Sequence, residues 1–172
     1  MTWTAPTPAA LDADPPVTGT DRPILEAYLA WQRSNILSIC AGLTAEQMAL
    51  RPLPATNLSL LGLVRHLAKV ERTWFRLRAT ATAEPFYDPA LGKDHDFEAI
   101  DPADAPGAVA ALVEEWKHSD AAVAGMSFED TFESGHGPWS LRMMYVHLIG
   151  EYSRHNGHAD LLREHIDGVT GR

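Results

Sequence analysis

Apolar residues recur at three- and four-residue spacing along four long stretches of this chain. This spacing is typical of helices that bury one face. The four predicted helices cover residues 23–43, 60–77, 106–126 and 140–167. No stretch of similar length alternates as a half-buried strand does. The pattern therefore predicts an all-α fold, a four-helix bundle with long loops between its helices.

Short polar residues and glycine mark the expected ends of these helices. Asp21 is the expected cap of the first helix, and either Asn57 or Ser59 is expected to cap the second. Residues 44–47, Thr-Ala-Glu-Gln, have the spacing of a capping box and predict a short additional helical turn. Gly168 is a normal stop for the fourth helix.

Three segments fall outside the helical pattern. Residues 1–21 are rich in Pro, Thr, Ala and Asp, and we expect a flexible or surface-wrapping arm before a single domain of residues 22–172. Residues 80–106 form a loop long enough to help shape a binding site. Residues 128–139 fit either a β-hairpin or an irregular loop, because they contain Gly-His-Gly-Pro.

Charge and cysteine content narrow the classes of function. The formal net charge of −9 argues against a nucleic-acid partner and against an anionic membrane surface. No apolar run is long enough to span a bilayer, and the N-terminus lacks the pattern of a secretory signal, so we expect a cytoplasmic protein. The single cysteine, Cys40, excludes an intramolecular disulfide and is expected to be an inert core thiol.

Titratable residues cluster on the fourth predicted helix. At about 100° per residue, His155 falls in the middle of the apolar stripe and Glu151 just inside its edge. His147 and His158 come out at the border of that face. On the second helix, His66 shares the apolar face and can meet the fourth helix across the core.

Glu151 and His155 are spaced i, i+4, as two ligands of one ion require. One carboxylate and two neutral imidazoles suit zinc first, with nickel, iron and manganese as alternatives, and leave positions open for water or substrate. The competing hypothesis has no metal, with His66 and its partners hydrogen-bonded inside the core.

The same residues carry a resemblance to a known family. The motifs are Gly-Leu-Thr-Ala-Glu-Gln at 42–47 followed by Arg-Pro, Ser-Leu-Leu-Gly-Leu-Val-Arg-His-Leu at 59–67, and Glu-Tyr-Ser-Arg-His-Asn-Gly-His at 151–158. Together they resemble the DinB/YfiT-like metalloenzymes, in particular an actinobacterial branch that includes the mini-circle protein and is related to mycothiol-dependent enzymes. The resemblance covers about residues 21–168.

The resemblance implies a four-helix bundle with a divalent metal held by one histidine of the second helix and two ligands of the fourth. Carried over to this chain, the ligands are His66, Glu151 and His155. The family commonly has histidine where this chain has Glu151, which leaves His147, one turn earlier, as an alternative ligand. His158 lies where many members carry glutamine.

Relatives of this kind use low-molecular-weight thiols such as mycothiol, so the first functional hypothesis is a metal-dependent S-transferase acting on a small electrophile. The second is a metal-dependent hydrolase with His158 or a displaced carboxylate as the catalytic base. The third is a binding or stress-associated protein in which a metal only clamps two helices. In each case a small molecule is the expected partner, with pairing into a homodimer as a further expectation.

Overall fold

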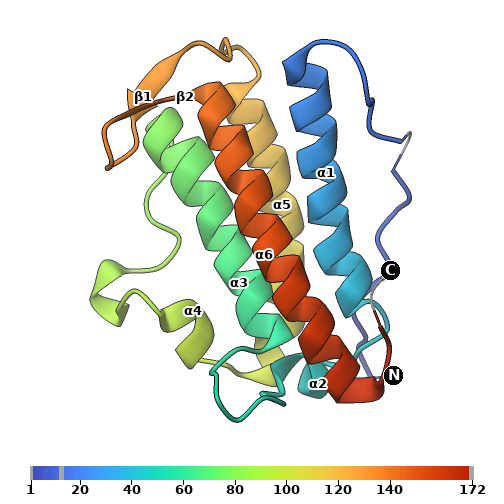
Figure 1. The fold of residues 1–172 in the computed structure, drawn as a ribbon. Coiled ribbons are helices and arrows are strands. Elements are labelled where there is room, and N and C mark those ends of the chain that lie inside the picture. The colour runs from blue at the N-terminus through green and yellow to red at the C-terminus, as the bar shows by residue number, and fades with distance from the viewer. Residues whose placement is uncertain (1, 12–13, 171–172) are drawn as a thin grey trace.

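The computed structural model describes residues 2–11 and 14–170. Within these residues, four long helices lie side by side (Figure 1): α1 (Asp21–Cys40), α3 (Leu60–Glu71), α5 (Ala105–Val123) and α6 (Leu141–Asp167). An eight-residue π-helix, η1 (Arg72–Ala79), continues α3 without interruption. The sequence did not predict this change of helix type. The chain is mostly helical, in agreement with the all-α expectation.

The long helices pack as α1 against α6, α3 against α5, and α3 against α6. Figure 1 shows α3 and α5 running in the same direction, opposite to α1 and α6. The segment between α3 and α5 must therefore return along the whole length of the helices, which explains why it is long. It is not entirely a loop, because it contains α4 (His95–Glu98) and the 3-10 turns η2 (Pro89–Leu91) and η3 (Pro102–Asp104).

The helix ends follow the capping chemistry in most places. Thr44 and Gln47 form both bonds of the capping box before α2 (Ala45–Ala49). Ser59 caps α3 by accepting a bond from the Gly62 amide, which decides between the two predicted caps. Gly168 ends α6 at φ 80°, a left-handed conformation that glycine adopts without strain.

The predicted cap of α1 is wrong. Thr20 occupies the N-cap position without a side-chain bond, and Asp21 is the first residue of the helix. The Asp21 carboxylate accepts instead from Nε of Arg142 at the start of α6. Competition from this tertiary ion pair explains why the side chain does not turn back to cap its own helix.

Residues 128–139 contain the hairpin and not the irregular alternative. Strands β1 (Thr131–Glu133) and β2 (Pro138–Ser140) pair antiparallel, with Phe132 opposite Trp139. Trp139 stacks on Trp74 of η1 at 4.8 Å between ring centroids. This contact holds the hairpin against η1, near the start of α6 (Figure 1).

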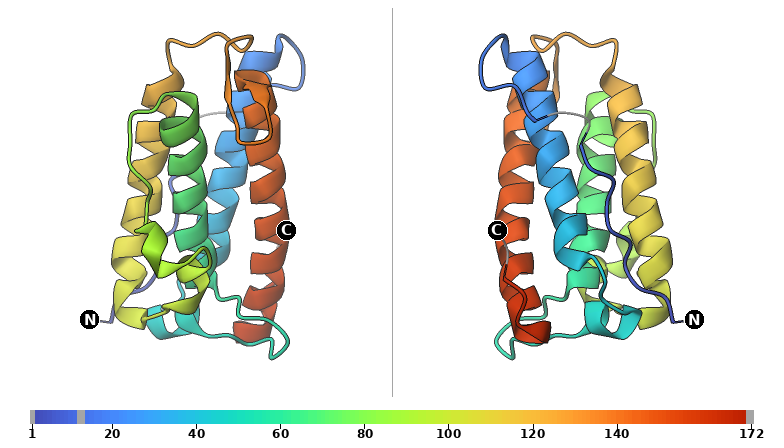
Figure 2. Two further views of the ribbon diagram at one scale, coloured as in Figure 1. Left: turned by 90° about the vertical axis from the view of Figure 1, so that its left-hand side faces the viewer. Right: turned by 90° about the vertical axis from the view of Figure 1, so that its right-hand side faces the viewer.

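Described residues of the N-terminal segment lie against the helices. The amide of Ala5 donates to the carbonyl of Leu43, and the amide of Gly42 donates to the carbonyl of Ala5, both at 2.8 Å. The segment then passes between α1 and α5 (Figure 2), where Pro8 and Leu11 help line a cavity. The structure thus shows these residues lying along the surface; residues 1, 12 and 13 of the predicted arm lie outside the described residues. Across the described chain, every helix is too short or too polar to cross a bilayer.

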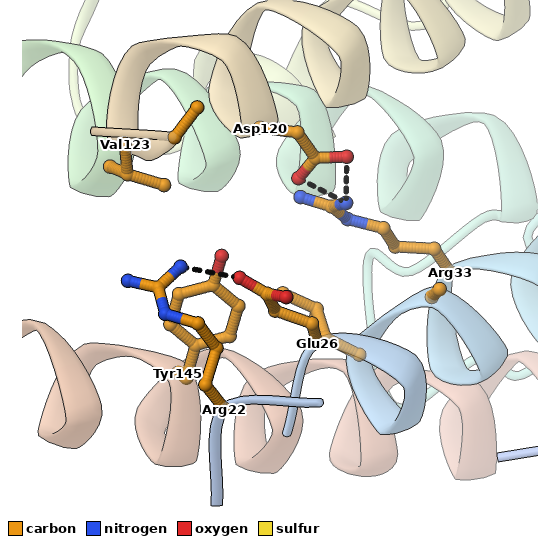
Figure 3. Close-up of a pocket in the computed structure, with 9 residues that line it drawn as sticks. Arg22, Glu26, Arg33, Asp120, Val123 and Tyr145 are labelled. Carbon is orange, nitrogen blue, oxygen red and sulfur yellow. Dashed lines mark hydrogen bonds and ion pairs between the residues drawn. The ribbon is translucent and has the colours of Figure 1, made fainter. Parts of the chain in front are cut away.

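A buried network of charged and polar side chains crosses the core. Nε and one terminal nitrogen of Arg33 donate to the two oxygens of Glu71, each at 2.8 Å. The hydroxyl of Tyr152 donates to Glu71 at 2.8 Å, and the indole of Trp116 donates to that hydroxyl at 2.7 Å. The other terminal nitrogen of Arg33 binds Asp120 (Figure 3). The network joins α1, α3, α5 and α6.

Candidate metal centre

Three of the predicted site residues converge between α3 and α6. His66 of α3 and Glu151 and His155 of α6 each offer one ligand atom, and these atoms lie within 4.8 Å of one another. The two imidazole rings are 4.7 Å apart between centroids. All three side chains are largely buried, with exposed fractions between 11% and 17%. We refer to His66, Glu151 and His155 as the ligand triad.

The environment keeps His155 neutral. Burial, reinforced by the neighbouring His66, lowers the pKa of His155 to about 4, although Glu151 acts in the opposite sense. Nε2 of His155 lies 3.4 Å from a Glu151 oxygen. An uncharged imidazole has one ring nitrogen with a free lone pair. This uncharged form is the one that binds a metal.

Two ring nitrogens of the triad are buried and unsatisfied. Nε2 of His66 and Nδ1 of His155 have no hydrogen-bond partner among the described residues. Burying a polar atom without a partner is costly, and such atoms in native proteins call for an explanation such as an ion. One ring nitrogen from each histidine and one carboxylate oxygen within 4.8 Å of one another fit a divalent metal that keeps an open coordination position.

His147 is placed apart from the triad. Its ring packs at 4.4 Å from Trp74 and 5.2 Å from Trp139, measured between centroids. Burial in this aromatic contact lowers the pKa of His147. It does not belong to the group of ligand atoms that lie within 4.8 Å of one another. These aromatic contacts suit a residue that lines the site better than a metal ligand.

His158, the predicted catalytic base, lies one turn beyond His155. It is half-buried, and its ring centroid is 5.5 Å from that of His155. Its Nδ1 is buried without a partner in the described part of the chain. An imidazole beside the triad, free of an ion-pair partner there, can exchange protons with a bound molecule.

Sequence reasoning missed Asp96. This residue of α4 is fully buried, and its Oδ2 lies 2.8 Å from Nδ1 of His66 and 2.6 Å from Nζ of Lys69. Burial opposes ionisation of Asp96, but the bonds from His66 and Lys69 outweigh it and hold its pKa below the ordinary value. The local sequence Asp-His-Asp at 94–96 carries carboxylates, but no periodicity shows which of them points inward.

The arginines near the site differ in what they bind. Arg72 and Arg76 both bind Glu115 of α5, whose side chain is buried. Their guanidinium groups are thus occupied in holding η1 against α5. Arg154 is exposed and lies 3.5 Å from Glu151. Of these three, Arg154 has the contact with the triad.

We expect the thiol of Cys40 to be unreactive in the folded protein. Its side chain is 1% exposed, and burial raises its pKa to about 12. The folded pKa lies above the ordinary value of 9.0, so folding disfavours the nucleophilic thiolate at every pH below about 12. Iodoacetamide at pH about 8, near the ordinary thiol pKa, should leave the native protein unmodified and should alkylate it fully in denaturant. Mass spectrometry gives the answer directly because the chain has one cysteine. Alkylation at equal rates in both states would contradict the burial.

Comparison with known proteins gives one positive result. The family model described as mycothiol-S-transferase matches residues 24–168, most of the chain. The matched span contains all four long helices apart from the first turn of α1, and all three members of the triad. No curated protein and no solved structure matches the chain.

Proposed function

We propose a metal-dependent thiol transfer for this chain, which belongs to the mycothiol-S-transferase family of DinB-like proteins. In this proposal His66, Glu151 and His155 hold a divalent cation, and a low-molecular-weight thiol of the mycothiol type is joined to a small electrophile. One observation carries the proposal: in a chain of this family, two histidines and a glutamate each offer one ligand atom, and these atoms lie within 4.8 Å of one another.

We further propose that α1, α3 with η1, α5 and α6 form the four-helix bundle expected from the sequence, with zinc as the cation. Two nitrogen ligands and one oxygen ligand are common in catalytic zinc sites, which keep a fourth position for water or substrate. When bound there, the cation would favour ionisation of a thiol and so supply a nucleophilic sulfur.

The surrounding residues support this chemistry. His158 can accept the proton of the incoming thiol. The sulfur then forms its bond to the electrophilic carbon, and the displaced group leaves with the electron pair of the broken bond. The stacked rings of Trp74 and Trp139, with His147 packed against both, form an apolar wall beside the triad. Such a wall limits the water that can compete with sulfur.

Burial of Cys40 is consistent with a thiol that comes from outside the chain. The only sulfhydryl of the protein lies in the core, and a covalent enzyme-bound sulfur intermediate therefore lacks a source. The reacting sulfur must belong to a cosubstrate.

The test is thiol consumption by protein that has been stripped of metal and then reloaded with zinc. Mycothiol or another small thiol is mixed with a panel of electrophiles, such as a halobimane, an aryl chloride and an epoxide. The expected result is zinc-dependent loss of thiol and a product mass equal to the thioether. His158→Gln should lower the rate by about 100-fold, the usual lower contribution of a general base, whereas His165→Gln, an exposed histidine of the same helix, should not.

Two outcomes would contradict the proposal. One is the absence of zinc-dependent turnover with any thiol of the panel. The other is zinc-dependent cleavage of esters or amides with no thiol present, which would favour the hydrolase that the sequence left as an alternative.

A further inference from the structure

We infer that Asp96 is a positioning residue for the proposed metal centre. Its carboxylate holds His66 in the tautomer with the proton on Nδ1, so that Nε2 keeps its lone pair for a metal. The inference rests on the proposed function for the presence of a metal. It concerns a residue that lies on α4, outside both helices that carry the triad.

The contacts of Asp96 determine the tautomer. An ionised carboxylate only accepts hydrogen bonds, so Nδ1 of His66, 2.8 Å away, must be the donor. In the form of the ring that binds a metal, which has a single proton, Nε2 is then left with its lone pair. That atom is buried and has no hydrogen-bond partner among the described residues. In known metal sites an outer carboxylate of this kind orients a histidine ligand and raises its donor strength, and Asp96 would do the same for His66.

Lys69 binds the same oxygen of Asp96 as His66 does. Its ammonium lies 2.6 Å from the same oxygen of Asp96 and donates to the carbonyl of Lys93 at 2.8 Å. Lys69 is one turn after His66 on α3, so both partners of Asp96 come from one helix face. Oδ2 of Asp96 thus accepts from the Lys69 ammonium on one side and from Nδ1 of His66 on the other, which fixes its place against the His66 ring.

The fold holds α4 close enough for these contacts. Arg65 of α3 donates to the carbonyls of His95 and Ala99, at the two ends of α4. At Gly62 an added Cβ would lie 3.1 Å from the ring of Phe97, tighter than ordinary packing. Glycine at this position therefore permits the close approach of α4, and Phe97 packs its ring 5.0 Å from that of His66.

A competing interpretation makes Asp96 a purely structural clip that fastens α4 to Lys69. The two interpretations differ in what happens to His66. A clip affects unfolding and leaves the tautomer and the metal affinity alone. A positioning residue changes both, even where the fold is intact.

The test compares Asp96→Asn with Asp94→Asn, an exposed carboxylate two residues away that serves as the matched control. Zinc affinity is measured by competition with a chromophoric chelator, and the tautomer of His66 in metal-free protein by nitrogen NMR of the imidazole. We expect Asp96→Asn to weaken zinc binding by about 10- to 100-fold and to produce a mixture of tautomers. Asp94→Asn should change neither. If Asp96→Asn folds poorly, Asp96→Glu retains the charge but moves it by one methylene, and a smaller loss in the same direction is expected.

Wild-type zinc affinity and an unchanged tautomer in Asp96→Asn would overturn the inference. If wild-type protein binds zinc and responds to Asp96→Asn but transfers no thiol, the proposed reaction is wrong and the role of Asp96 stands. If the wild-type protein binds no zinc, both are wrong.

Discussion

Replacing His155 by alanine is expected to remove zinc from the protein and to abolish thiol transfer. A four-ligand zinc site contributes about 10–16 kcal/mol of binding free energy, or roughly 3 kcal/mol for each ligand. Loss of one of three protein ligands should therefore weaken zinc binding by at least about 100-fold. Metal content after gel filtration and chelator competition would measure the loss. Folding should survive, because the residue removed has a buried nitrogen without a hydrogen-bond partner in the described chain.

Two other histidines of α6 provide controls for this result. His165 is exposed, and its Nδ1 lies 2.8 Å from the carbonyl of Leu161 in its own helix, so His165→Ala should bind zinc normally. His147→Ala tests the alternative ligand directly. Its ring packs on Trp74 and Trp139, so we expect normal zinc stoichiometry. Loss of zinc in His147→Ala together with retention in His155→Ala would contradict the triad and favour the alternative.

Helical positions calculated at about 100° per residue placed Glu151 and His155 on the buried face, and this works because α6 is a regular helix. It is a single helix of 27 residues, so the rotation of about 100° per residue accumulates without interruption. Glu151 and His155 thus fall on the face that meets α3, and the apolar stripe of α3 places His66 opposite them. Periodicity is informative wherever a long helix buries one face against another.

The same reasoning had no means of finding Asp96. A helix of four residues is too short to show a period, and α4 lies in a segment with no apolar stripe. Its orientation depends on Arg65 and on the space left by Gly62, both more than thirty positions earlier in the chain. The inward direction of Asp96 is thus a tertiary property, and only the structure shows it.

Buried charges in the core were missed for a related reason. Nothing in the local sequence distinguishes Glu71 from an exposed helix carboxylate. Its side chain is 0% exposed because it pairs with Arg33, 38 residues earlier on α1. Similarly, Arg72 and Arg76 read as surface residues because their partner, Glu115, lies on another helix. Local sequence patterns indicate which face of a helix is apolar. Ion pairs between helices depend on how the helices are positioned against one another, which local patterns do not show.

Replacing Glu71 by alanine is expected to destabilise the metal-free protein strongly. Removing one partner of a buried ion pair costs about 3–5 kcal/mol, because the remaining charge is left uncompensated in the core. Arg33 would keep its bond to Asp120, so the loss should lie near the lower end of that range. The hydroxyl of Tyr152 would also lose its acceptor. Denaturant unfolding, followed by circular dichroism, measures the change.

A second Arg–Glu pair in the same protein provides the matched control. Arg22 and Glu26 form an ion pair at 2.6 Å on α1, but Glu26 is 43% exposed (Figure 3). Exposed pairs contribute about 0–1 kcal/mol, so Glu26→Ala should change the unfolding free energy by no more than that. Equal effects of Glu71→Ala and Glu26→Ala would mean that water reaches the core network and that its burial is not what makes it strong.

The buried network also contacts the two helices that carry the triad. The effects of Glu71→Ala and His155→Ala on zinc binding can therefore be compared. Glu71 lies five residues after His66 on α3, and its partner Tyr152 lies directly after Glu151 on α6. The bond between them therefore joins the two helices that supply the triad, about one turn away from the triad residues. We expect Glu71→Ala to weaken zinc binding as well as folding, whereas His155→Ala should weaken zinc binding alone. Normal zinc affinity in a folded Glu71→Ala protein would show that the packing of α3 on α6 positions the triad without this bond.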